Sequence, residues 1–266
     1  MRQVYCLIKN ETARSHRWYY IHNNYIDFDM IKKLGILGGM GPAASNEFVT
    51  RLVAKTPATK DQDHIPFVLW SNSTIPDRST SMLNGDDKPL PYLLAGIQGL
   101  KIAGCTTIVI PCNTAHFWFS HLEKIAAWNA KIIHIVDSVA DALRDIKITN
   151  DKIGIIGTKA TIEYGLYQYQ LNKLGWDCIT PTKEQMDTQV QPAIDLIKAN
   201  QIAEAHSMFM TIIHSLIDKG AKSVVLGCTE IPLSIKEDTV QDIPIINSID
   251  SLVNAAIREF KREKLT

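Results

Sequence analysis

The chain has 266 residues, a length that suits one large domain or two smaller ones. Its 28 basic and 28 acidic side chains cancel, so no net positive charge is available to attract nucleic-acid phosphates or an anionic membrane. Hydrophobic residues make up 45% of the chain, which is typical of a globular protein, and no apolar run approaches the roughly 20 residues that span a bilayer. Five cysteines, an odd number without a C-x-x-C pair, favour a reduced, cytoplasmic protein.

Residues 1–30 differ from the rest of the chain. The stretch Arg14–Tyr25 is aromatic and polar, shows neither a strand nor a helix period, and lacks the apolar core of a secretory signal. The first strong strand pattern begins just after Met30. We therefore expect either that Met30 is the functional start or that residues 1–30 form a loosely structured N-terminal extension.

From residue 31 onward, short β-rich apolar runs alternate with helical patterns. This alternation predicts an α/β fold of doubly wound, mainly parallel sheets flanked by helices. Apolar residues at helical spacing between Ile194 and Leu216 mark one helical region, and a last helix is expected at about 248–263. Strands are expected at Leu34–Leu37, Phe67–Trp70, Thr107–Ile110, Ile132–Val136, Ile153–Ile156, Ser223–Leu226 and Ile243–Ile246.

Three segments of the chain repeat in the same order and at similar offsets. Leu34–Gly38 resembles Ile153–Gly157, Gly104–Thr114 resembles Gly220–Glu230, and Ile135–Val139 resembles Ile245–Ile249. Such a repeat predicts two related α/β halves, at residues 31–139 and 140–247, with a pseudo-two-fold relation between them. The helix at 248–263 is then free to pack back on the first half.

The repeat places Cys112 and Cys228 at the same point of each half, just after a buried strand. Ligands of open parallel sheets bind beyond the carboxyl ends of the strands, so both thiols are expected at one site between the halves. A helix N-terminus after each cysteine would lower the thiol pKa and, with Asn113, Thr114 and Thr229, would hold a carboxylate.

Two acid–base groups on opposite faces of one carbon are what a racemase needs. One thiolate removes the α-proton while the other thiol delivers a proton to the far face, and the roles exchange in the reverse direction. A buried cysteine is usually only a small hydrophobic residue, and this ordinary role is expected for Cys6, Cys105 and Cys178. Cys105 is expected to precede its strand.

Three motifs resemble the signatures of the aspartate/glutamate racemase family. They are Gly38–Ala44 (GGMGPAA), Pro111–His116 (PCNTAH) and Leu226–Leu233 (LGCTEIPL), and the resemblance covers essentially residues 31–260. It implies a cofactor-independent amino-acid racemase, commonly a homodimer, with a two-domain pseudosymmetric fold and the site between the halves. No PLP is required.

The resemblance also assigns roles to individual residues. Cys112 and Cys228 would be the catalytic acid–base pair, the loop of Met40 would line the site, and Asn113, Thr114 and Thr229 would bind the α-carboxylate and α-amino groups. Glu230 replaces the histidine of glutamate racemases, so the chain resembles the aspartate-racemase branch. A carboxylate at Glu230 would orient a neighbouring group or bind the ammonium, and it would raise the pKa of the adjacent thiol.

The resemblance also implies that two cationic side chains select the substrate. Arg78, in the segment Ile75–Arg78, and Lys159, in the segment Gly157–Thr161, match positions that grip the side-chain carboxylate in aspartate-selective members. An Arg fork binds a carboxylate bidentately, whereas Lys supplies a point charge. Asn72, in a strand-end loop, is a weaker binding candidate. The expected substrate is therefore aspartate, with glutamate second.

Other functions fit these residues less well. The glycines after the first strand lack the G-x-G-x-x-G order of dinucleotide sites, and Cys112 with His116 supplies too few ligands for a metal. A cysteine hydrolase pairing Cys112 with a histidine would leave Cys228 unexplained. A maleate isomerase or hydantoin racemase with the same paired cysteines is the alternative enzyme, and a small-ligand binding protein is the non-enzymatic one.

Overall fold

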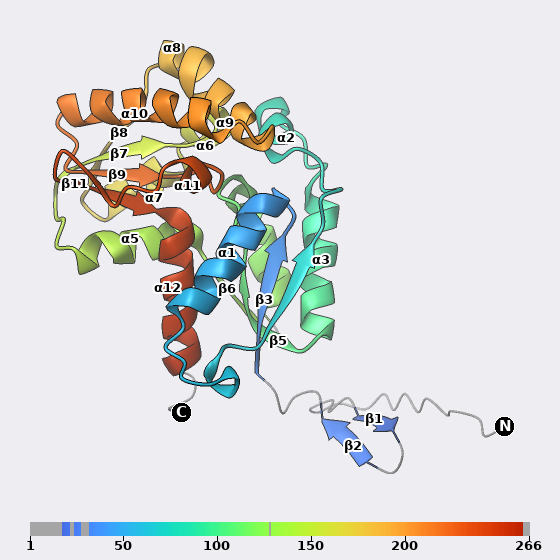
Figure 1. Cartoon of the computed structure of the whole chain (residues 1–266). Coiled ribbons are helices and arrows are strands. Elements are labelled where there is room, and N and C mark those ends of the chain that lie inside the picture. Colours follow the sequence, from blue (N-terminus) through green and yellow to red (C-terminus); the bar gives the residue numbers. More distant parts are fainter. Residues whose placement is uncertain (1–17, 22–23, 28–31, 128, 263–266) are drawn as a thin grey trace.

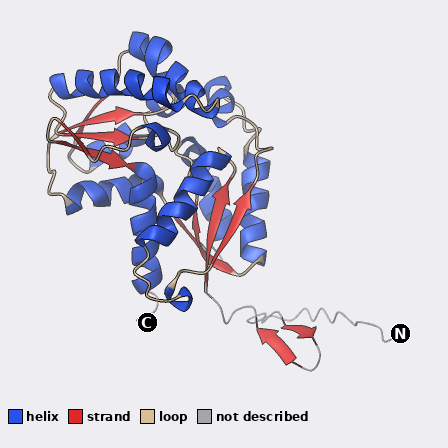
Figure 2. Cartoon of the chain, in the orientation of Figure 1, coloured by secondary structure: helices blue, strands red, loops and turns tan. Residues whose placement is uncertain are grey.

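The computed structural model describes residues 18–21, 24–27, 32–127 and 129–262. Within the predicted extension it shows two short antiparallel strands, β1 (Trp18–Ile21) and β2 (Asn24–Asp27). The other residues of that extension, Met30 among them, lie outside the described residues. From Lys33 onward, two sheets with helices on both faces form the α/β fold expected from the sequence (Figures 1 and 2).

The first sheet is four-stranded and entirely parallel, in the order β4-β3-β5-β6. Two of its expected strands differ from the structure by two or more residues at one end. The third begins at Cys105, so this cysteine lies in its strand and does not precede it, because its backbone extends the pairing with Lys33. The fourth ends early because a helix begins at Ile135. The strands are β3 (Lys33–Gly38), β4 (Phe67–Ser71), β5 (Cys105–Val109) and β6 (Lys131–Ile133).

The second sheet is five-stranded, in the order β10-β11-β9-β7-β8. All neighbours are parallel except β10, which pairs antiparallel with β11. Without β10 and read from the other edge, the order β8-β7-β9-β11 matches the order β4-β3-β5-β6 of the first sheet strand for strand, as the internal repeat predicts. The strands are β7 (Lys152–Ile156), β8 (Asp177–Ile179), β9 (Ser223–Leu226), β10 (Thr239–Val240) and β11 (Ile243–Asn247).

Helices cover both faces of each sheet. In the part of the chain that the structure describes, none is long and apolar enough to cross a membrane. Short 3-10 or π turns lie at Asp61–Asp63, Thr114–Trp118 and Met186–Val190. The α-helices are α1 (Pro42–Lys55), α2 (Arg78–Asn84), α3 (Leu90–Ile102), α4 (Phe119–Ala126), α5 (Ile135–Asp145), α6 (Lys159–Glu163), α7 (Leu166–Lys173), α8 (Lys183–Gln185), α9 (Gln191–Lys198), α10 (Ile202–Asp218), α11 (Ile231–Ser234) and α12 (Ser248–Arg262).

The last helix of each half crosses to the other half. Helix α12 follows the second sheet, yet it packs against α1 and contacts β5 and β6 of the first (Figure 1). Helix α5 follows the first sheet and packs against α7 and β11 of the second, and the boundary expected at 139/140 falls inside it. One hydrophobic cluster therefore joins both halves, from Ile36 through Val139 and Leu252 to Ile155, and fixes the two sheets relative to each other.

The turn after β3 needs glycine at position 39. Gly39 has a φ of 91°, and a Cβ atom there would lie 2.3 Å from the backbone carbonyl carbon of Asn72. Any side chain would meet both a steric and a conformational penalty. This close approach lets the turn bring Met40 into the space between the two sheets, where it is buried.

Candidate active site

Cys112 and Cys228 line one cavity between the halves, as their matched positions predict. Cys112 follows β5 and is 5% exposed, and Cys228 follows β9 and is 4% exposed. The remaining space is about 20 Å³, enough for roughly one water, so the cavity must widen to admit an amino acid. Its lining residues are Met40, Asp77, Arg78, Ser79, Cys112, Asn113, Thr114, Thr158, Lys198, Cys228, Thr229 and Glu230.

The thiol pKa values move in the direction opposite to that expected from the helix ends. Burial raises the pKa of both Cys112 and Cys228 because a thiolate is poorly solvated inside the protein. The expected backbone donors are present, since the N–H groups of Ala115 and Glu230 each favour the thiolate of the neighbouring cysteine. Only short turns follow the cysteines, and the cost of burial outweighs their donors.

The two cysteines have different charged neighbours. The Sγ of Cys228 donates a hydrogen bond to Oε2 of Glu230 at 3.1 Å, and the negative charge of Glu230 raises the pKa of Cys228 further. Glu230 also lies against the turn after β3, where a Cβ at Gly41 would be 3.2 Å from its Oε1. The positive charge of Arg78 acts in the opposite sense on Cys112 and lowers its pKa against the effect of burial. Glu230 therefore favours the thiol of Cys228, and Arg78 favours the thiolate of Cys112.

Arg78 has a side-chain donor that no group of the described residues satisfies. Its Nη1 donates to the backbone carbonyls of Ile75 and Pro76, each at 3.2 Å, which fixes the guanidinium at the start of α2. Its Nε is buried and has no hydrogen-bond partner among the described residues. An unpaired charged donor at a cavity wall is costly, and a bound carboxylate would satisfy it.

Polar side chains from both halves meet behind the cysteines. Thr114 Oγ1 lies 3.2 Å from the hydroxyls of both Thr158 and Thr161, which come from the second half. Thr229 is buried and lines the cavity beside Cys228. The residues expected at the site from both cysteine motifs, Asn113 included, are thus brought together.

Two of the predicted binding residues lie elsewhere. Lys159 does not line the cavity; its Nζ forms ion pairs with Asp187 at 3.1 Å and Glu163 at 3.9 Å. The side-chain oxygen of Asn72 accepts hydrogen bonds from the backbone N–H and hydroxyl of Thr74, and Asn72 is not part of the cavity wall either.

The structure adds a cation that the sequence reasoning missed. Lys198, the last residue of α9, lines the cavity near Asp77 and Arg78. Lysine in the last turn of a helix ordinarily complements the helix dipole, so its position in the sequence gave no signal of a site. The other lining residues that were not expected are Asp77, Ser79 and Thr158, the last from the segment that carries Lys159.

His116 does not act on the thiol of Cys112. Its Nδ1 donates to the backbone carbonyl of Cys112 at 2.9 Å, and its Nε2 accepts from the N–H of Ile135 at 3.2 Å. Burial lowers the pKa of His116 to about 3, so the ring is neutral at physiological pH. Because both ring nitrogens bond to the backbone, His116 holds the turn that follows Cys112 and is available neither as a metal ligand nor as a base.

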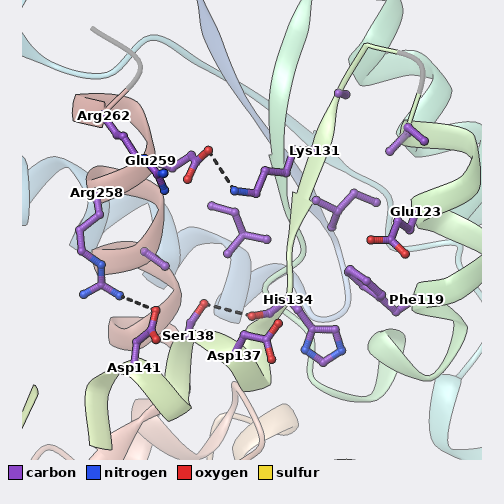
Figure 3. Close-up of a pocket in the computed structure, with 16 residues that line it drawn as sticks. Phe119, Glu123, Lys131, His134, Asp137, Ser138, Asp141, Arg258, Glu259 and Arg262 are labelled. Atoms are coloured by element: carbon purple, nitrogen blue, oxygen red, sulfur yellow. Dashed lines mark hydrogen bonds and ion pairs between the residues drawn. The ribbon is translucent and has the colours of Figure 1, made fainter. Parts of the chain in front are cut away.

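A larger cavity, of about 660 Å³, lies away from the cysteines between β6, α4, α5 and α12 (Figure 3). Its charges are largely paired with one another. Lys131 and Glu259 form an ion pair at 3.0 Å, and Arg258 pairs with Asp141 at 3.4 Å. The small cavity, which holds two thiols and an unsatisfied cation, is therefore the better candidate for chemistry.

Comparison with known proteins identifies relatives of the whole two-sheet fold. The chain is 25% identical to the broad specificity amino-acid racemase RacX of Bacillus subtilis (strain 168), over 85% of this chain and 97% of that protein. The structure of the Picrophilus torridus aspartate racemase superposes with a TM-score of 0.75 at 30% identity, covering 86% of this chain and 94% of that one.

A more distant structure, the glutamate racemase of Francisella tularensis subsp. tularensis, shares the fold with a TM-score of 0.66 at 16% identity, over 89% of this chain and 83% of that one. The family model described as Asp/Glu/Hydantoin racemase matches residues 37–256. This match spans both sheets and both cysteine loops. The chain thus belongs to the Asp/Glu/hydantoin racemase family and is an amino-acid racemase.

Proposed function

We propose that the protein interconverts L- and D-aspartate, with glutamate as a second substrate, by proton transfer between Cys112 and Cys228. The observation that carries the proposal is the single buried cavity to which the two repeated halves each contribute one cysteine. A planar intermediate held there would have one thiol group at each face. The proposal needs no PLP, because both acid–base groups are side chains of this chain.

The charges around the thiols suggest their resting forms. With Arg78 beside it, Cys112 is the better thiolate, and Cys228, which donates to Glu230, is the better thiol. In one direction the Cys112 thiolate takes the Cα proton and becomes a thiol, while Cys228 gives its proton to the opposite face and becomes a thiolate. The reverse direction exchanges these roles and restores the starting state.

Two cations support an acidic substrate. Arg78 from the first half and Lys198 from the second line the same cavity, and the Nε of Arg78 has no partner among the described residues. Lys198 has an exposed ion pair with Asp195 at 3.5 Å, which a second substrate carboxylate could replace. A dicarboxylic amino acid would then contact both cations, whereas a monocarboxylic one would contact only one of them. In this proposal Lys198 takes the part that the resemblance gave to Lys159, because Lys159 is paired with Asp187 outside the cavity.

The test is NMR of α-proton exchange in D₂O, with L-aspartate and L-glutamate in parallel and no PLP added. Deuterium entering at Cα together with a growing D-enantiomer is expected, faster for aspartate. Cys112→Ser and Cys228→Ser should each lower racemisation by about 10²–10⁴. Cys178→Ser, which changes a thiol in β8 outside the cavity, should leave it unchanged.

If neither acid exchanges in the folded wild-type protein, the aspartate and glutamate assignment is wrong. Maleate and a 5-substituted hydantoin then become the substrates to test, since the alternative enzymes use the same pair of cysteines. Faster turnover of glutamate than of aspartate would reverse the order of the two proposed substrates.

A further inference from the structure

Tyr167, on α7, lies between the two cysteine loops. Its side chain is fully buried, and its hydroxyl donates a hydrogen bond of 2.6 Å to Oδ1 of Asn113, the residue after Cys112. Its ring faces Gly227, the residue before Cys228, where a Cβ atom would lie 2.9 Å from Cε2 of the ring. One side chain therefore touches the neighbour of each cysteine.

The contact fixes the amide of Asn113. While Oδ1 accepts from Tyr167, Nδ2 donates to the hydroxyl of Ser248 at 3.1 Å, at the start of α12. A side-chain amide has two N–H donors, so one donor of Asn113 is left for the cavity that this residue lines. Burial raises the pKa of Tyr167, so its phenol stays protonated and serves as a donor.

The bond also crosses the molecule. Tyr167 belongs to the second half, Asn113 to the first, and Ser248 begins the helix that returns to the first half. Their side chains are buried, so water does not compete with the two bonds. The amide of Asn113 can rotate only if both of these hydrogen bonds break.

We infer that Tyr167 is a positioning residue. It holds the Asn113 amide toward the substrate and fixes the loops of Cys112 and Cys228 relative to each other. This inference rests on the proposed function, because it assigns the free N–H of Asn113 to the bound amino acid. Tyr167 does not itself line the cavity, so it acts through Asn113 and Gly227.

The first experiment compares Tyr167→Phe, which removes only the hydroxyl, with Tyr164→Phe, the same change on an exposed tyrosine of the full chain. Tyr167→Phe is expected to lower kcat/KM about 10-fold, mainly through KM, since Asn113 would hold the substrate in the ground and transition states alike. Tyr164→Phe should match the wild type. An unchanged KM in Tyr167→Phe would overturn the inference.

A double-mutant cycle separates positioning from general structural support. With Asn113→Ala already present, Tyr167→Phe should have no further effect on kcat/KM, because the bond it removes is gone. Fully multiplicative effects would show that Tyr167 does not act through Asn113. If Tyr167→Phe fails to fold, Ser248→Ala releases the same amide from its other side and enters the cycle in its place.

A measurement that needs no turnover can test the role of Tyr167 separately from the proposed racemase function. Iodoacetamide alkylation of Cys112 and Cys228, followed by peptide mass spectrometry, is expected to be several-fold faster in Tyr167→Phe at both thiols, with no additional gain in the double variant. Equal rates in the wild type and Tyr167→Phe would contradict the inference. A wild-type protein that racemises neither acid would defeat the proposed function, while the alkylation cycle would still test the role of Tyr167.

Discussion

The loops that carry Cys112 and Cys228 occupy the same place in the two halves, yet their charged neighbours differ. Glu230 raises the pKa of both thiols, and Arg78 opposes this at Cys112. The guanidinium of Arg78 favours the thiolate at Cys112, whereas Glu230 accepts a hydrogen bond from the thiol of Cys228 and raises its pKa. Burial is the main cause of the raised pKa at both thiols, and the charged neighbours favour deprotonation of Cys112 over Cys228. A repeated backbone thus supplies two equivalent positions, and unrepeated side chains make them chemically different.

The largest expected effect comes from removing either thiol. Cys112→Ser and Cys228→Ser should each lower racemisation by about 10²–10⁴, the usual contribution of a positioned acid or base. Deuterium exchange should be followed from L- and D-aspartate separately. If the loops differ as described, each variant retains slow exchange from only one enantiomer, and the two variants retain opposite ones. Equal residual exchange from both enantiomers in one variant would show that the two thiols do not serve opposite faces of the substrate.

Arg78→Gln should have the next largest effect, about 10²-fold on kcat/KM for aspartate, because it removes both a carboxylate donor and the cation near Cys112. Without that cation the pKa of Cys112 rises. The acid limb of the pH profile, in the direction that uses Cys112 as base, should move to higher pH. Arg144→Gln, on the exposed face of α5, is the matched control. If kcat/KM falls but the acid limb does not move, then Arg78 binds the substrate carboxylate and does not stabilise the thiolate of Cys112.

Lys198→Gln should raise KM for aspartate about fivefold and leave kcat nearly unchanged. The effect is smaller than that of Arg78 because the side chain of Lys198 is 46% exposed and solvent screens its charge. Lys159→Gln is the matched control, since Lys159 lies outside the cavity, and its KM should stay within about twofold of the wild type. If Lys159→Gln instead raised KM more than Lys198→Gln, the substrate carboxylate would be assigned to Lys159.

Glu230→Gln should have the smallest effect on turnover at neutral pH, about threefold, and its main signature should be in the pH dependence. Removing the negative charge lowers the pKa of Cys228, because Glu230 raises it in the wild type. The alkaline limb, in the direction that needs Cys228 protonated, should therefore move to lower pH. Iodoacetamide should also alkylate Cys228 faster near neutral pH. Glu237→Gln, on the surface beside His206, should change neither result.

The fold followed from the sequence where the signal was local or repeated. Six of the strand segments lie in the two sheets largely as the apolar runs predict, and the repeat anticipates the matching strand order. Strands β1, β2, β8 and β10 were missed because each is only two to four residues long and leaves little periodicity to detect. The placement of α12 against α1 joins residues far apart in the chain, and the helical pattern does not specify which face it covers.

The sequence by itself predicted that two thiols line one cavity. Cys112 and Cys228 could be matched because duplicated motifs preserve position, and the carboxyl ends of parallel strands share one edge of the sheet. Only the tertiary structure decided which lysine lines their cavity. Lys198 lines the cavity and Lys159 pairs with Asp187, although Lys159 has the stronger motif context.

The state of the thiols was also a tertiary property. The turns after the cysteines do supply N–H donors, as expected, but burial raises both pKa values instead of lowering them. The bond from Tyr167 to Asn113 likewise joins two halves that no local pattern links. Desolvation and long-range contacts depend on what surrounds a residue in space, whereas strand periodicity and repeated motifs depend on its neighbours along the chain. The sequence therefore predicted where the two thiols are, and the folded chain determined what acts on them.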